Sequence, residues 1–147
     1  MKTKALNFLL MLTIVFFVSI SQSKAQERDS KVYDVVDEMP EYPGGEIALV
    51  QEIAYLIKYP EGASFNGTEG KVYVNFVVNK EGKIADAKIA RGIGPDFDRE
   101  ALRVINKLEK TWRPGIKSEQ KVDVSIVVLF EFKNDGTVTS KIYNPEK

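Results

Sequence analysis

The sequence predicts an α+β fold in which two helices pack on a small antiparallel sheet. Alternating apolar residues mark two long strands, at residues 71–78 and 122–132. Apolar residues at helical spacing mark two other segments, at 46–57 and 98–108. Runs rich in Pro and Gly separate these segments. The expected order is therefore (β)-α-β-β-α-β-(β), with the helices covering one face of the sheet.

The first 25 residues look like an export signal. Lys2 and Lys4 precede an apolar run from Ala5 to Ile20, and Ser23-Lys24-Ala25 fits a small-x-small cleavage site. The apolar run has 16 residues, fewer than the roughly 20 that span a bilayer comfortably. We expect cleavage before Gln26. The alternative is that residues 5–22 remain as a short membrane anchor.

The rest of the chain divides into three parts. Residues 26–37 are expected to be a linker, although Lys31–Val36 also fits a short strand. Residues 38–133 are the predicted folded domain, and residues 134–147 a C-terminal hairpin strand and tail. The eight-residue run from Glu38 to Gly45 holds two prolines and two glycines, which prescribe one backbone path into the first helix. Tyr59-Pro60 ends that helix, because the residue before proline avoids the α region.

The elements that follow are predicted by alternation and turn chemistry. After the strand ending at Val78, Asn79–Lys83 is a hairpin turn with Gly82 available for positive φ. The return strand, Ile84–Ala90, alternates imperfectly, and a β-bulge would restore its pattern. Asp98 is the expected N-cap of the second helix. The long strand Val122–Phe132 leads to Asn134-Asp135-Gly136, a strong hairpin signal, and to a short last strand within Val138–Tyr143.

Composition excludes several kinds of function. The chain contains no His and no Cys, so the usual nucleophilic triads, imidazole or thiolate metal sites and disulfides are absent. Residues 1–25 hold three lysines and no acid, which leaves 18 basic and 21 acidic residues in the remainder. That balance disfavours nucleic-acid binding. We expect no catalysis, no cofactor and no metal.

Two groups of acidic residues have the composition of a cation site. Asp34, Asp37, Glu38 and Glu41 are better explained as a solvated acidic segment. The carboxylates between Asp96 and Glu100 are better explained as favourable charges at a helix N-terminus. A hydrolase based on paired carboxylates would need a deep cleft, which is hard to build in a domain of this size.

Several motifs, in order, resemble the C-terminal domain of TonB proteins of the Bacteroidetes type. They are Met39-Pro40-Glu41-Tyr42-Pro43-Gly44-Gly45, Tyr59-Pro60, the segment from Glu69 to Val78, Glu81-Gly82-Lys83-Ile84, Asp98-Arg99-Glu100-Ala101-Leu102-Arg103-Val104-Ile105, Trp112-Arg113-Pro114-Gly115 and Phe130-Glu131-Phe132. Each motif is weak alone. Their order and spacing over residues 38–132 make the resemblance specific.

The resemblance implies a periplasmic, protein-binding domain in transmembrane transport. Members use a sheet edge to pair with an extended segment, the TonB box, of outer-membrane transporters, which is β-augmentation. The candidate edge residues are Val122, Asp123, Val124, Ser125, Ile126, Val127, Val128 and Leu129. The sequence leaves open whether this strand is exposed or covered by Thr137–Tyr143. The Asn-Asp-Gly turn favours a hairpin, in which Thr137–Tyr143 would cover the strand.

Other motif residues are expected to have structural roles. They are Pro43, Gly44, Gly45, Tyr59, Pro60, Gly70, Trp112, Pro114 and Gly115. Trp112 in particular is expected to pack in the core rather than to contact a partner.

The chain also departs from full-length energy transducers. At most twelve residues, Gln26 to Asp37, lie between the signal and the domain, about 42 Å when fully stretched. No histidine is available for coupling to a membrane motor. The first hypothesis is therefore an exported, stand-alone domain that binds transporter segments or other envelope proteins. The alternatives are an inner-membrane transducer that keeps its anchor and a self-associating homodimer.

Overall fold

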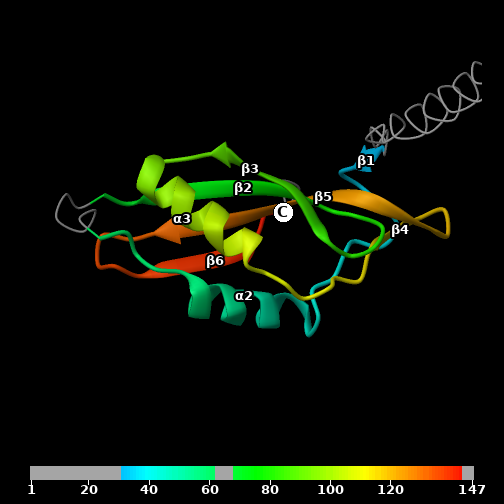
Figure 1. Ribbon diagram of the computed structural model, residues 1–147, viewed down its shortest axis with the longest axis horizontal. Helices are drawn as coiled ribbons and strands as arrows, with labels where there is room; N and C mark the ends of the chain where they lie inside the picture. Colours follow the sequence, from blue (N-terminus) through cyan, green and yellow to red (C-terminus); the bar gives the residue numbers. More distant parts are fainter. Residues whose placement is uncertain (1–30, 62–67, 144–147) are drawn as a thin grey trace, which may run out of the picture. The chain divides into compact units, whose positions relative to one another are not determined.

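The computed structural model describes residues 31–61 and 68–143. The expected export signal, most of the expected loop between Gly62 and Gly70, and the last four residues lie outside the described residues. Figure 1 shows the described elements. They are β1 (Val32–Tyr33), α2 (Gly45–Leu56), β2 (Gly70–Val78), β3 (Ile84–Arg91), α3 (Pro95–Asn106), β4 (Gly115–Lys117), β5 (Gln120–Phe132) and β6 (Val138–Ile142). The predicted α+β order is confirmed, and β4 is an addition to it.

The sheet is built around β5. Its strand order is β1-β5-β2-β3, and β6 and β4 also pair with β5. β2 and β5 are antiparallel and in continuous register from Gly70↔Phe132 to Val78↔Val124. β1 alone runs parallel to its neighbour, with Val32 opposite Asp123, so the otherwise antiparallel sheet is mixed. Residues Lys31–Asp37 contain β1 and make further contacts with the domain. The folded part of the chain therefore begins before residue 38.

The expected β-bulge in the return strand is present. The register between β2 and β3 shifts twice, between Tyr73 and Val74 and between Asn75 and Val77. Asp86 has φ 51°, a left-handed conformation that accommodates extra residues in the bulged strand. The imperfect alternation of β3 therefore reflects a real irregularity at this side of the sheet.

The helices lie close to their expected positions, with two corrections. α3 begins at Pro95 with Gly94 as N-cap, so Asp98 is not the N-cap. Proline is well suited to the first helical turn, where its missing N–H costs nothing. In α2 the fully buried residues are Leu49 and Ile53. Ile47, expected on the apolar face, is exposed.

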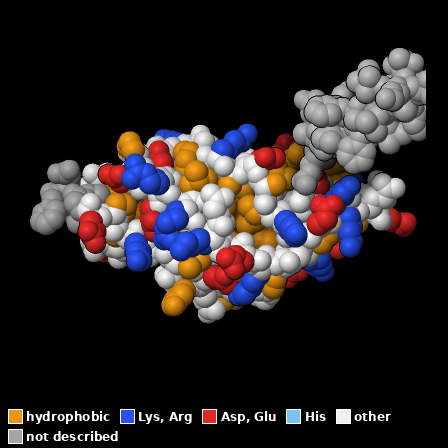
Figure 2. Space-filling model, in the orientation of Figure 1, with side chains coloured by type: hydrophobic (Ala, Val, Ile, Leu, Met, Phe, Trp, Pro, Cys, Tyr) orange, Lys and Arg blue, Asp and Glu red, His pale blue; other side chains and the backbone are white. Residues whose placement is uncertain are grey.

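Both helices lie on one side of the sheet (Figure 1). α3 packs against β2 and β3, and α2 packs against β6. The core between helices and sheet includes Phe76, Phe130 and Trp112, none more than 2 % exposed. Figure 2 shows blue and red side chains intermixed over this side of the molecule. No charge of a single sign dominates it.

Candidate functional site

The strand expected as a candidate edge lies inside the sheet. β2 pairs with one side of β5 from Val124 to Phe132. β6 pairs with the other side from Val128 to Phe132. The turn between β5 and β6 is closed by the Lys133 N–H donating to the Thr137 carbonyl at 2.9 Å. Of the two arrangements that the sequence left open, the structure has the covered one, because the strand β6 lies along Val128–Phe132.

The side chains of these eight residues alternate between the two faces of the sheet. Val124, Ile126 and Val128 face the helices and are at most 3 % exposed. Val127 and Leu129 lie on the opposite face, opposite Asn75 and Tyr73 of β2. The first three are therefore core residues, and the second pair lies on the face away from the helices.

The remaining three candidates are engaged in local structure. The Asp123 carboxylate accepts a hydrogen bond from the Lys80 N–H at 2.8 Å, which holds the β2–β3 hairpin. The Ser125 hydroxyl accepts one from the Asn75 side-chain amide at 2.8 Å. Val122 pairs with β4. None of these three side chains is placed for direct contact with a new strand.

The outer edge of β3 has no strand beside it among the described residues. Its two register shifts and the positive φ of Asp86 make it irregular. Lys88 and Arg91 on this strand are exposed. Bulges and charges are the features with which natural sheets prevent pairing at an edge. β3 is therefore a poor template for another strand.

The outer edge of β6 is partly covered by α2. The Glu46 carboxylate of α2 accepts a hydrogen bond from the Ile142 N–H at 3.2 Å. Ile142 lies opposite Val128 of β5, and its N–H points away from that strand. A helix beside an edge is a second way of blocking strand addition.

The strands β5 and β6 pair over a short stretch without a register shift. The Tyr143 N–H donates to the Val127 carbonyl at 2.8 Å. Because hydrogen-bonded pairs alternate in antiparallel sheets, the next such pairs are Leu129 with Lys141 and Glu131 with Thr139 in the observed register. The backbone groups of Val127, Leu129 and Glu131 are therefore the ones that β6 occupies.

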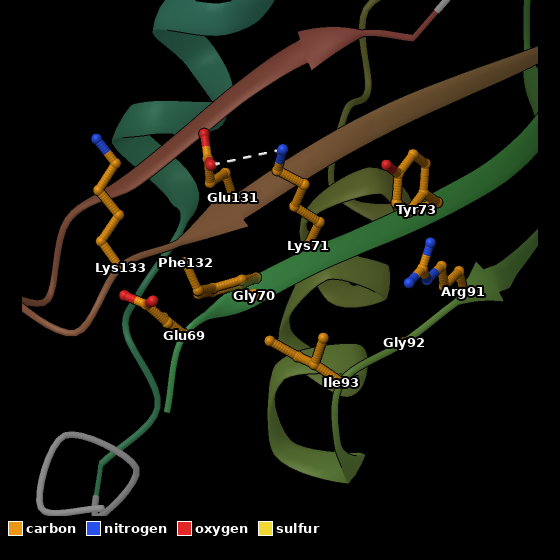
Figure 3. Close-up of a pocket in the computed structure, with 10 residues that line it drawn as sticks. All are labelled: Glu69, Gly70, Lys71, Tyr73, Arg91, Gly92, Ile93, Glu131, Phe132 and Lys133. Atoms are coloured by element: carbon orange, nitrogen blue, oxygen red, sulfur yellow. Dashed lines mark ion pairs between the residues drawn. The ribbon is translucent and has the colours of Figure 1, made fainter. Parts of the chain in front are cut away.

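The face of the sheet away from the helices carries the most distinctive exposed features (Figure 3). Lys71 and Glu131 form an ion pair at 3.8 Å across β2 and β5. The Tyr73 and Tyr143 rings meet edge to face, with centroids 5.1 Å apart. A hollow of about 540 Å³ lies at the end of these strands, with Arg91 on its rim. A strand bound beside β5 would place alternate side chains on this face.

The Pro/Gly segment and the Trp-Arg-Pro-Gly motif hold each other. The Arg113 N–H donates to the Glu41 carbonyl at 2.8 Å, and the Glu41 N–H donates to the Arg113 carbonyl at 3.0 Å. Their side chains also form an ion pair. The Ile116 N–H donates to the Glu38 carbonyl at 2.9 Å. We call this paired contact between the two motifs the clasp. It contains or adjoins Pro43, Gly44, Pro114 and Gly115.

Trp112 connects this clasp to the β2–β3 hairpin. Its indole is 2 % exposed and packs edge to face on Tyr42 and Phe76. The backbone N–H of Trp112 donates to the Gly82 carbonyl at 2.8 Å. Gly82 has φ 78°, and a Cβ there would lie 2.0 Å from the Trp112 carbonyl oxygen. The structure thus places Trp112 in the core, where it contacts neighbouring motifs.

Tyr59 and Gly70 are also placed at structural positions, and Pro60 is half-buried in the segment that follows α2. The Tyr59 hydroxyl donates to the Thr68 carbonyl at 2.7 Å, and its ring packs edge to face on Phe97 and Phe132. A Cβ at Gly70 would meet the Ile93 side chain at 2.8 Å. These residues fix the approach to β2.

The Glu100–Arg103 motif joins the two helices. The Arg103 guanidinium donates to the Glu100 carboxylate at 2.6 and 2.7 Å and to the Leu56 carbonyl at 2.7 Å. The Lys58 N–H donates to Glu100 at 2.7 Å. The Arg103 hydrogen bond lowers the pKa of Glu100, with a smaller contribution from Lys58. The motif therefore secures the C-terminal end of α2.

The acidic residues at α3 have a structural explanation. The Asp98 carboxylate accepts a hydrogen bond from the Ile93 N–H at 3.0 Å. In the parts of the chain that the structure describes, no group of three or more acidic residues is arranged to hold a metal ion. Within those same parts, no helix is long and apolar enough to cross a membrane.

Sequence reasoning did not identify Glu46 or the inward residues of β6 as relevant to the site. The Asn134-Asp135-Gly136 turn did signal that the chain would return. The partner of Glu46 lies 96 residues away, and no local pattern specifies such a contact.

Comparison with known proteins agrees with the fold and the motifs. Residues 56–134 match the family described as Gram-negative bacterial TonB protein C-terminal. The chain is also 29 % identical over 79 residues to the Protein TonB of Helicobacter pylori. That alignment covers 53 % of this chain but only 27 % of the relative. The match ends at residue 134, before β6 begins.

Proposed function

Because the chain belongs to the family of TonB C-terminal domains, we propose that it binds extended segments of TonB-dependent outer-membrane transporters or of other envelope proteins. It does so by β-augmentation, as a binding domain without catalysis. The observation that carries the proposal is that the family match includes a long strand, β5, which lies at the C-terminal end of the matched region and pairs with most other strands of the sheet.

The chemistry of such binding suits this chain. Backbone hydrogen bonds supply affinity in β-augmentation, and alternating side-chain positions supply selectivity. β5 pairs in register with β2 from Val124 to Phe132 and with β6 along five residues. No cofactor is needed for this activity.

We propose that the domain acts in the periplasm, released there after cleavage before Gln26. An inner-membrane form that keeps residues 5–22 is the alternative. Sequencing the N-terminus of the protein recovered from cells distinguishes the two. A mature chain that starts at Gln26 supports the exported form, and an intact N-terminus in the inner-membrane fraction contradicts it.

The binding role is tested with synthetic peptides. Fifteen-residue peptides tiling the N-terminal segments of the outer-membrane transporters of the same bacterium are immobilised and probed with the purified chain. Scrambled peptides of equal composition are the control. Retention by defined transporter segments is the expected result. If no segment retains the chain above its scrambled control, and only self-association is seen, the transport role is wrong.

A further inference from the structure

We propose that the face of the sheet away from the helices docks on an anionic lipid surface. The inference goes beyond the proposed function, because it concerns a second surface and does not depend on which strand a protein segment pairs with. It is carried by the charge of this face, by the kinds of side chain that form it and by the hollow at its end.

The first observation is an excess of positive charge on this face. The exposed basic residues that the strand registers and the hollow place there are Lys71, Lys88, Arg91, Lys133 and Lys141. The acidic residues on it or at its edge are Glu69, Glu131 and Asp86. Residues 26–147 hold 18 basic and 21 acidic residues in total, so basic residues are concentrated on this face. The side that carries the helices shows both signs intermixed (Figure 2).

Most of these basic side chains lack an acidic partner. Lys71 pairs with Glu131 at 3.8 Å, and the two side chains remain 52 % and 41 % exposed. Within the described parts of the chain, Lys88, Arg91 and Lys141 form no ion pair. A cation close to an anionic bilayer gains free energy that falls off within a Debye length. Several such cations on one side of the domain would therefore draw that side toward a membrane.

The second observation is the kind of side chain that this face offers. Its apolar residues Val77 and Leu129 are at most 8 % exposed, so little aliphatic surface is available. The Tyr73 and Tyr143 rings meet edge to face, with centroids 5.1 Å apart, and Tyr143 is 38 % exposed. Tyrosine combines an apolar ring with a polar tip and is enriched where proteins meet the membrane–water interface.

This composition favours a lipid surface over a protein. Protein interfaces have an apolar centre and are depleted in lysine. Here four of the five basic residues are lysines, and the aliphatic residues between them are covered. Lysine carries a point charge on a flexible stem, which suits headgroups that exchange positions. An acidic polypeptide is the competing occupant that an experiment must exclude.

The third observation is the hollow of about 540 Å³ at the end of β2 and β3 (Figure 3). Lys71, Arg91 and Lys133 line it, together with Glu69 and Glu131. Glu131 is already paired with Lys71. The guanidinium of arginine can bind phosphate oxygens through two parallel hydrogen bonds. The hollow therefore offers space and charge for the phosphate group of a lipid at one end of the face.

Vesicle flotation tests the inference without the N-terminal apolar run. The fold is a compact unit that begins at Lys31, so the exported chain from Gln26 contains all of it. Vesicles of phosphatidylcholine and phosphatidylglycerol are compared with vesicles of phosphatidylcholine alone. Binding to the anionic vesicles should be about tenfold stronger or more. Raising the salt from about 0.1 M to about 1 M, which shortens the Debye length from about 10 Å to about 3 Å, should abolish the difference.

Removal of charge locates the contact. Lys88→Gln with Lys141→Gln should weaken binding to the anionic vesicles about tenfold, because each cation near the surface contributes to it. Lys58→Gln with Lys107→Gln is the matched control. Both control residues are exposed and follow the ends of α2 and α3, on the side of the helices, so this variant should bind as the parent does. Equal losses in the two variants would mean that only net charge matters and would overturn the inference.

The orientation of the bound domain is read with a fluorescent label, since the chain has no cysteine. Thr139→Cys on β6 and Gln51→Cys on α2 introduce single thiols at exposed positions. Each is labelled with a nitrobenzoxadiazole dye, whose emission shifts to the blue in apolar surroundings. Anionic vesicles should shift the emission from position 139 and leave that from position 51 unchanged. A shift from position 51, or from neither position, would overturn the inference.

The competing occupant and the proposed function are separated in the same assay. Polyglutamate represents an acidic polypeptide. If it binds the parent chain while anionic vesicles do not, the lipid assignment is wrong. Lipid binding without retention by any transporter segment leaves this inference standing and contradicts the proposed function. Retention by transporter segments without lipid binding supports the proposed function and contradicts this inference.

Discussion

The carboxylate of Glu46 on α2 accepts a hydrogen bond from the N–H of Ile142 on β6, at 3.2 Å. This contact joins the start of the first helix to the last strand. It lies on the side of β6 that faces away from β5. Glu46 therefore helps to hold β6 beside β5.

Glu46→Ala should loosen β6 without disturbing the core. Loss of one partly exposed hydrogen bond is worth about 1 kcal/mol, or about fivefold faster local opening. Amide hydrogen exchange should accelerate at Lys141, Ile142 and Tyr143 and stay unchanged in β2. Glu46→Gln keeps an acceptor and should retain most of the protection. Gln51→Ala, at an exposed position of α2, is the control. Uniform acceleration across the sheet would show that Glu46 supports the whole fold instead.

The turn between β4 and β5 offers a stabilising substitution. Ser118 and Glu119 have φ of 49° and 62°, values that favour glycine or asparagine in two-residue hairpin turns. Glu119→Gly should raise the free energy of unfolding by about 0.5–1 kcal/mol, because it removes left-handed strain from a non-glycine residue. Glu119→Ala removes the same side chain but keeps a Cβ, and should bring no gain. Chemical denaturation measures both, and a loss of stability in Glu119→Gly would contradict the account.

Gly82→Ala should be strongly destabilising. The added Cβ would lie 2.0 Å from the Trp112 carbonyl oxygen, so both the hairpin and the clasp around Trp112 would have to shift. Combined steric and φ strain suggests a loss of about 2–4 kcal/mol. Gly136→Ala is the matched control: φ is also positive, at 82°, but nothing lies within 4 Å. It should cost only about 1 kcal/mol. Equal losses in urea denaturation would mean that contact with Trp112 is unimportant.

Stability should fall in acid partly through Glu100. The Arg103 hydrogen bond lowers the pKa of Glu100 in the folded state, with Lys58 adding to the effect. A carboxyl group whose folded pKa is depressed stabilises the fold above its unfolded pKa and loses that contribution as pH falls through the folded pKa. The loss should therefore begin below the ordinary glutamate value of about 4.5.

Glu100→Gln is the test of that assignment. The variant should be less stable than the parent at pH 7 by about 1 kcal/mol, from the lost charge-assisted hydrogen bonds. The difference should shrink as pH falls below the glutamate value. Glu109→Gln, at an exposed position after α3, is the control. A stability difference that does not change with pH would contradict the role given to Glu100.

Much of the fold was predictable because it depends on local patterns. Alternation predicted β2 and β5, and the poor alternation of Ile84–Ala90 correctly predicted a bulge in β3. Positive φ at Gly44 and Gly45 agrees with the path expected for the Pro/Gly segment. The start of α3 was misplaced because Asp98, a common N-cap type, lies four residues after the actual cap at Gly94. Its carboxylate instead binds the N–H of Ile93.

The position of β5 in the sheet was not predictable in the same way. Val127 and Leu129 make its second face apolar, a pattern that fits a covered strand and a binding strand equally well. Only the partners of β5 decide between them. In α2, Ile47 fits the helical spacing but lies on the solvent side, because the helix rotates to bury Leu49 and Ile53. Contacts between distant segments determine both outcomes.

Site-specific photo-crosslinking in living cells tests most directly whether β5 pairs with transporter segments. A photoreactive amino acid is placed at Glu131, beside β6, or at Lys88, on the bulged edge of β3, and captured peptides are identified by mass spectrometry. We expect capture of N-terminal transporter segments from position 131 and not from position 88. Capture of such segments from position 88 alone, or of nothing except a second copy of the chain, would contradict it.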